Sequence, residues 1–289
     1  QGVGAPRRPP GHMAAHGAGP GEGGALAGAL SGVAPELAAY VAAQAVVFAP
    51  CLVLARRLWP RHKDPWSLAD VLYSAGLFPV LTASAMLASW RLRGSVALRW
   101  HGVLPESRFF LMLYTSRALL HCFVQCRQQS SRLHFLLMSL HHCLSILCFC
   151  GALASQSMHF WACLEGCCEM STVFLNNVFI CKEVTLNGRE LKELVPGWLY
   201  AANGLCVWLS FLLFRIVLFP LWLYMWHRDV ITWPEATWER STPMERYLYP
   251  AVTTFLLVLS VYWFVPVTKG MLKAVGLPRA AGRGGGKEL

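Results

Sequence analysis

Two adjacent histidines stand near the middle of an apolar stretch of the sequence, residues 133–151. His141 and His142 lie among leucines, cysteines and phenylalanines, and His134 precedes His141 by seven residues, which places both on nearly the same face of a helix. An imidazole in hydrocarbon must find a polar partner, so histidines within a membrane face a bundle interior or a wet cavity. His141 and His142 are therefore the candidate catalytic residues, as bases in a proton transfer.

A stripe of polar side chains follows in the next apolar segment, residues 158–181. Its members are four, three and four residues apart, which places them on one helical face over three turns: Glu165, Glu169, Thr172 and Asn176. Arg117 and His121 share a face of an earlier segment, and Arg215 stands in a later one. A carboxylate within a membrane stays charged only when it is paired, so the two arginines are the expected partners of the two glutamates. These seven residues are the candidate substrate-binding set.

Each of these residues also has a purely structural interpretation. A buried glutamate–arginine pair can do no more than fix the register of two helices, and a histidine in a bundle often bonds only a backbone carbonyl. A carboxylate could instead orient His141 or His142. Asp70, near the start of another apolar segment, is assigned to the membrane interface or to a helix N-terminus, where its charge complements the helix dipole. The aromatic residues of the last two apolar segments are expected to face lipid or the interface.

The composition indicates the elements that must position these residues. The chain has 289 residues, of which 55% are hydrophobic and 14% charged, whereas soluble domains carry about a quarter of their residues as charges. Its mean hydropathy is +0.44. A helix needs about 20 apolar residues to cross a bilayer, and seven spans are expected, over residues 37–58, 68–90, 109–126, 133–151, 158–181, 198–226 and 247–267. The predicted fold is an all-α, polytopic transmembrane helical bundle, with a tight turn near Ser155 and a distortion near Pro220.

Four regions follow from these spans. Residues 1–35, rich in Gly, Ala and Pro, are expected to form a disordered tail; residues 36–66 hold the first transmembrane helix and a basic loop; residues 67–273 form the main transmembrane domain; residues 274–289 are a basic, Gly-rich tail. Lysines and arginines gather after the odd-numbered spans, which places the C-terminal tail in the cytoplasm. The net charge of +10 is expected to meet anionic headgroups at the cytoplasmic face and not nucleic acid. Membrane lipids are thus the expected partners, and a homo-oligomer is left open.

Cysteine spacing gives little support to a metal site. The eleven cysteines lie within or at the ends of the predicted spans, and no two have the Cys-x-x-Cys spacing, so free thiols and no bound metal are expected. An intramembrane metallohydrolase is a weaker alternative, because its candidate ligands lack a familiar three-ligand spacing: His121, His141, His142 and Glu169.

Three motifs in order resemble the TLC-domain family, which includes ceramide synthases and translocon-associated chain proteins. Residues 135–145, Phe-Leu-Leu-Met-Ser-Leu-His-His-Cys-Leu-Ser, are similar to the double-histidine helix of the family. Residues 168–172, Cys-Glu-Met-Ser-Thr, followed by Asn176, resemble its glutamate helix, and residues 211–220, with Arg215 and Pro220, resemble its arginine–proline helix. The resemblance covers residues 67–273 and is closest to the small members of the family.

The resemblance implies a lipid-handling bundle of the endoplasmic reticulum membrane, with the plasma membrane or Golgi as alternatives. It implies transfer of a fatty acyl group to an amine such as a sphingoid base, with His141 or His142 catalytic, fatty acyl-coenzyme A as co-substrate and no bound cofactor. The chain departs from the family pattern in two helices. Cys143 follows His142 where ceramide synthases have an aspartate. In the preceding helix, where many small members have an aspartate, this chain has Ser116 and Arg117. The alternative is a non-catalytic protein that binds lipid or regulates membrane lipid composition.

Overall fold

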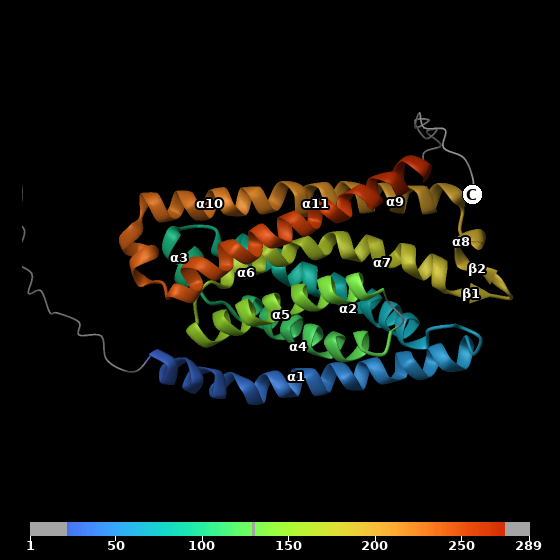
Figure 1. The fold of residues 1–289 in the computed structure, drawn as a ribbon, viewed down its shortest axis with the longest axis horizontal. Coiled ribbons are helices and arrows are strands. Elements are labelled where there is room, and N and C mark those ends of the chain that lie inside the picture. Colours follow the sequence, from blue (N-terminus) through green and yellow to red (C-terminus); the bar gives the residue numbers. More distant parts are fainter. Residues whose placement is uncertain (1–21, 129–130, 275–289) are drawn as a thin grey trace, which may run out of the picture.

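The long helices of this protein run side by side in one bundle (Figure 1). The computed structural model describes residues 22–128 and 131–274; residues 1–21 and 275–289, which hold most of the predicted N-terminal tail and nearly all of the C-terminal one, lie outside this part. The helices are α1 (Glu22–Leu58), α2 (Pro65–Leu92), α3 (Val96–His101), α4 (Pro105–Gln125), α5 (Arg132–Ser155), α6 (His159–Gly166), α7 (Met170–Glu183), α8 (Leu191–Leu194), α9 (Gly197–Phe211), α10 (Leu218–Thr232) and α11 (Tyr249–Ala274). Two short strands, β1 (Thr185–Leu186) and β2 (Arg189–Glu190), are the sole departure from the all-α prediction within the described residues.

Five helical segments of the described chain are long and apolar enough to cross a membrane. They are Ser31–Leu58, Pro65–Leu92, Arg132–Ser155, Gly197–Thr232 and Met244–Leu272, and they coincide with five of the seven predicted spans. The other two correspond to α4, which carries three charged residues, and to α6 with α7, which a 3₁₀ turn at Cys167–Glu169 separates. Both pack against the spanning helices: α4 lies against α1, α2 and α5, and α7 lies against α2 and α9. An integral membrane protein is confirmed, and the count of seven spans stays a prediction.

Helix α1 begins earlier than the sequence pattern indicated. It starts at Glu22 and continues through Pro35 and Pro50, so it extends into the stretch 1–35 that composition assigned to a disordered tail. Several of residues 22–35 are alanines, which have the highest intrinsic helix propensity. The many glycines and prolines of residues 1–35 led the composition to indicate disorder, although these alanines favour helix.

The bundle presents apolar side chains both to its interior and to its surroundings. Val46, Leu136 and Val258 are 72%, 62% and 64% exposed, an outward surface that suits contact with lipid. Against the prediction, part of the aromatic set of the last two spans points inward. Trp222 and Trp226 are buried with stacked rings whose centroids are 4.9 Å apart, so these rings fill the core.

Helices α9 and α10 are joined by a π-helical segment, Leu212–Val217. Pro220 follows three residues later and has no N–H to donate to the carbonyl of Ile216, which accounts for the distortion that the sequence predicted here. Arg215 lies within the π-helical segment and is buried. Such segments are frequent at functional sites, because they change the direction in which side chains point.

The charged connection between α7 and α9 contains a small hairpin. Thr185 pairs with Glu190 and Leu186 with Arg189 in antiparallel register, and Asn187 and Gly188 form the turn with positive φ values of 53° and 80°. Asn-Gly is the preferred sequence of such two-residue turns. The short helix α8 follows the hairpin directly and ends before Pro196.

Candidate functional site

Three histidine rings meet where α4 packs against α5. The ring centroid of His142 is 4.8 Å from that of His121 on α4 and 5.1 Å from that of His141. Within the described residues, Nδ1 of His141 and both ring nitrogens of His142 are buried without a hydrogen-bond partner. Buried polar atoms without partners are rare. The chain therefore leaves hydrogen-bonding capacity for another molecule at this place. His134, predicted on the same face of α5, is exposed and outside the cluster.

An ion pair between α2 and α4 lies beside the histidine rings. Asp70 Oδ1 accepts a hydrogen bond of 2.7 Å from Arg117 Nη2, and Asp70 Oδ2 lies 3.4 Å from His121 Nδ1. Arg117 also donates to Ser74 Oγ at 3.2 Å. Asp70, assigned from the sequence to the membrane interface or to a helix N-terminus, thus has a specific partner between α2 and α4, which the sequence did not indicate. The sequence pattern suggested Glu165 or Glu169 as the partner of Arg117. The structure pairs Arg117 with Asp70 instead.

Arg215 connects the π-helical segment to the glutamate helix. Its Nε donates to Ser171 Oγ at 2.7 Å and its Nη2 donates to Thr172 Oγ1 at 3.2 Å. Glu169 Oε2 lies 4.0 Å from Nη2, at the outer limit of an ion pair. The predicted pairing of an arginine with Glu169 is thus confirmed for Arg215. In the described chain, hydroxyl groups accept the side-chain hydrogen bonds of Arg215, and Glu169 adds a longer ion-pair contact.

The remaining members of the polar stripe serve contacts between helices. Glu165 Oε1 accepts a hydrogen bond of 3.0 Å from Thr253 Oγ1 on α11, and no arginine or lysine among residues 22–128 and 131–274 pairs with it. Asn176 Nδ2 donates to the backbone carbonyl of Val71 at 2.9 Å. In the described chain neither side chain bonds a histidine ring. The stripe is therefore divided between the Arg215 contact and helix packing.

No metal-binding arrangement is found among the residues that the structure describes. No three His, Cys, Asp or Glu side chains there are placed to hold one ion, so the metallohydrolase set is not assembled as a metal site. All eleven cysteines are free thiols. The predicted carboxylate partner of His141 or His142 is also missing from this part of the chain, and Asp70 instead faces His121.

A hydrogen-bond network that the sequence did not predict supports Arg117. Gln44 of α1 donates to the carbonyl of Leu113 at 2.8 Å and to the Ser116 hydroxyl, and it accepts a hydrogen bond from the Tyr73 hydroxyl. The guanidinium carbon of Arg117 lies 5.5 Å from the centre of the Tyr73 ring. The one available signal was Gln44 itself, an amide in an otherwise apolar run.

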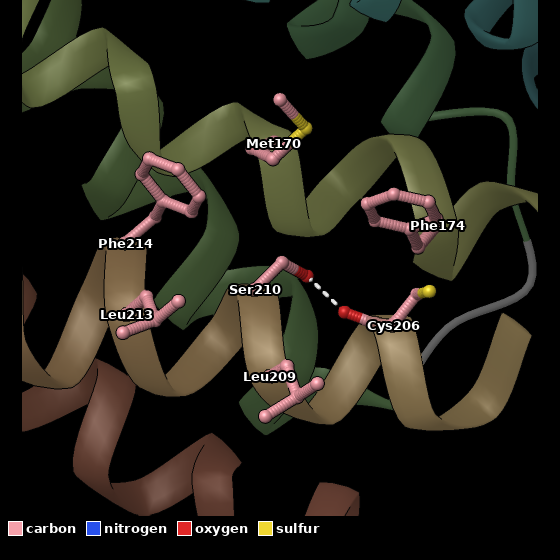
Figure 2. Close-up of a pocket in the computed structure, with 7 residues that line it drawn as sticks. All are labelled: Met170, Phe174, Cys206, Leu209, Ser210, Leu213 and Phe214. Atoms are coloured by element: carbon pink, nitrogen blue, oxygen red, sulfur yellow. Dashed lines mark hydrogen bonds between the residues drawn. The ribbon is translucent and has the colours of Figure 1, made fainter. Parts of the chain in front are cut away.

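An apolar groove lies between α7 and the helix formed by α9 and the π-helical segment, and Figure 2 shows it in close-up. Its volume is about 270 Å³, and it is lined by Met170, Phe174, Cys206, Leu209, Ser210, Leu213 and Phe214. The one hydroxyl, that of Ser210, donates to the carbonyl of Cys206 at 2.5 Å (Figure 2). The groove therefore offers almost no polar group and can hold a hydrocarbon chain. Met170 and Phe214 of the groove are the sequence neighbours of Ser171 and Arg215. The groove therefore lies beside the hydrogen bond that Arg215 donates to Ser171.

Comparison with known proteins gives one match. A family model described as the TLC domain matches residues 71–269, a stretch that contains all three clustered histidines and Arg215. Asp70 stands immediately before it. Neither the comparison with curated proteins nor the comparison with solved structures found a match.

Proposed function

Because this chain belongs to the TLC-domain family, we propose that it is an enzyme of membrane lipid metabolism that transfers a fatty acyl group from a coenzyme A thioester to an amine. The observation that carries the proposal is the group of three histidine rings, in which Nδ1 of His141 and both ring nitrogens of His142 have no hydrogen-bond partner among the described residues. The sphingoid base accepted by ceramide synthases is the amine we would test first. The endoplasmic reticulum is the proposed location.

The reaction needs a group that moves one proton. The amine nitrogen attacks the thioester carbonyl, a C–N bond forms and the C–S bond breaks, and the amine proton passes through a base to the departing thiolate. His142 suits this role because both of its nitrogens are unpartnered within the described residues. Its ring packs edge to face against His121, which faces Asp70. Asp70 then acts as a positioning residue that fixes the His121 ring, and Arg117 fixes Asp70.

The apolar groove supports a long-chain substrate. Its lining is suited to an acyl chain, and it lies beside the buried Arg215. We assign Arg117, His121, Glu169, Thr172 and Arg215 to the polar surroundings of the substrate. Glu165 and Asn176 form hydrogen bonds that join neighbouring helices. We therefore propose no substrate contact for these two residues.

A second candidate function is non-catalytic binding of a membrane lipid. It is favoured by the pairing of Asp70 with Arg117 and of Arg215 with hydroxyl groups, because residues satisfied in this way can orient a headgroup without chemistry. Cys143 in place of the aspartate of ceramide synthases agrees with it.

The test compares product formation with lipid occupancy in purified protein. Wild type, His141→Ala/His142→Ala and the control His134→Ala are incubated with a long-chain acyl-coenzyme A and a sphingoid base, and product and co-purified lipid are measured by mass spectrometry. An enzyme loses product in the double variant and keeps its bound lipid, while the exposed His134 variant behaves as wild type. Bound lipid with no product from wild type over a panel of amines would reject the enzyme and support the binding protein.

A further inference from the structure

A cleft of about 840 Å³ lies at the end of the bundle where α1 ends, α2 begins and α7 ends. Its walls are the loop between α1 and α2 and the β1–β2 hairpin, which project at one end of the helices (Figure 1). Trp59 Nε1 donates to the carbonyl of Thr185 at 2.6 Å, and His62 Nε2 lies 2.8 Å from Glu183 Oε2. These two contacts join the walls, so the fold itself sets the shape of the cleft.

Positive side chains line this cleft together with carboxylates. Arg61, Lys63 and Lys182 line it, and none is within ion-pair distance of a carboxylate in the part of the chain that the structure describes. Three cations from two distant parts of the sequence therefore surround one cleft. Like charges repel, and placing them together becomes favourable when an anion binds between them.

The carboxylates of the cleft, by contrast, are engaged. Glu183 faces His62, and Glu190 Oε2 lies 2.5 Å from Lys192 Nζ, a hydrogen bond that raises the pKa of this lysine. Asp64 accepts hydrogen bonds from the first backbone N–H groups of α2. Each of these carboxylates thus has a partner in the part of the chain that the structure describes, whereas the three cations have no ion-pair partner there.

The cleft lies where two candidate membrane-spanning segments, Ser31–Leu58 and Pro65–Leu92, end and begin. Helices of the bundle begin and end here, at the boundary between apolar and charged sequence, and phosphate groups occupy this boundary in a membrane. Asp64, the N-cap residue of α2, stands six residues before Asp70, a rise of about 9 Å along the helix axis. The cleft and the histidine cluster thus lie near one end of α2.

We propose that this cleft binds the phosphate group of an anionic ligand through Arg61, Lys63 and Lys182. Phosphate suits a cleft lined by three cations because its several oxygens accept charge-assisted hydrogen bonds at the same time. The group could belong to an anionic lipid headgroup or to a soluble phosphate compound, and the chemistry of the site is the same for both. The proposal does not depend on acyl transfer.

The experiment measures binding of both kinds of phosphate to the full chain in nanodiscs. Lipid binding is followed by native mass spectrometry in phosphatidylcholine nanodiscs with and without phosphatidic acid, and soluble binding by calorimetric titration with adenosine diphosphate. The variant is Lys63→Gln/Lys182→Gln. The control, Arg57→Gln/Arg189→Gln, removes the same charge from exposed side chains of α1 and β2 that do not line the cleft. A further variant, Lys63→Arg/Lys182→Arg, keeps the charge.

We expect the cleft variant to bind its ligand about tenfold more weakly, or worse, since each lysine near such a surface contributes about 1 kcal/mol. The charge-keeping variant and the control stay within about twofold of wild type. Loss confined to phosphatidic acid identifies a lipid headgroup, and loss confined to adenosine diphosphate identifies a soluble phosphate. Equal loss in the cleft variant and the control, or no binding of either probe to wild type, overturns the proposal. His141→Ala/His142→Ala should bind both probes as wild type does, which separates this result from that of the acyl-transfer test.

Discussion

The guanidinium of Arg117 lies 2.7 Å from the carboxylate of Asp70, and the two side chains are only 8% and 13% exposed. The pair joins α4 to α2 beside the histidine rings. Two charges buried in this way have been taken out of water at high cost, and each depends on the other for compensation.

Removal of one member of this pair should destabilise the protein much more than removal of both. Asp70→Leu or Arg117→Met leaves a buried charge without its partner, and each should lower the free energy of unfolding by about 3–5 kcal/mol. The double variant Asp70→Leu/Arg117→Met should lose far less. Reversible unfolding in mixed detergent micelles, followed by circular dichroism, measures all three. If the losses of the single variants simply add in the double variant, the two side chains do not interact in the folded protein.

Asp70 should also affect the reaction without affecting lipid binding. Asp70→Asn keeps the size of the side chain and removes the charge that faces His121 Nδ1, so the ring loses its fixed orientation. We expect kcat to fall about tenfold or more, with KM for the acyl donor unchanged and with partial recovery in Asp70→Glu. Steady-state kinetics below the unfolding temperature of the variant provide the measurement. A parallel loss of co-purified lipid would instead mean that Asp70 serves only the structure.

Gly166 should resist substitution where another helical glycine does not. A Cβ atom at Gly166 would lie 2.1 Å from the ring of the fully buried Phe110, whereas one at Gly76 would meet nothing within 4 Å. Overpacking a core costs about 1–3 kcal/mol, while alanine in place of an exposed helical glycine stabilises by up to about 1 kcal/mol. The midpoint of thermal unfolding should therefore fall in Gly166→Ala and stay level or rise in Gly76→Ala. Equal midpoints would show that α4 and α6 are not packed this closely.

The sequence predicted the helices better than the contacts between them. Apolar runs and their flanking charges located the long helices, and helical spacing correctly placed Glu169 and Thr172 together on the side facing Arg215. The partner of Arg117 was missed because Asp70 is 47 residues away and its position near a helix start has an ordinary local explanation.

Local signals were also outweighed by composition. The Asn187-Gly188 turn is a recognisable hairpin sequence, but it lies in a charged loop whose other residues favour helix. The meeting of His121 with His142 required the packing of α4 on α5, and residues of one sequence do not reveal how two helices are rotated against each other.

Filling the apolar groove should separate chain binding from chemistry. Cys206 lies on the side of α9 that faces Phe174 of α7 (Figure 2), so Cys206→Phe would place a ring where an acyl chain would lie. Leu205, its neighbour on the same helix, is 46% exposed and does not line the groove, which makes Leu205→Phe the matched control. We expect Cys206→Phe to raise KM for long-chain acyl donors about tenfold, because each excluded CH₂ group forfeits about 0.8 kcal/mol, and to leave short-chain donors unaffected. Co-purified long-chain lipid should fall in parallel. If both variants retain the chain-length profile of wild type, the acyl chain binds elsewhere in the bundle and the groove is only a seam between α7 and α9.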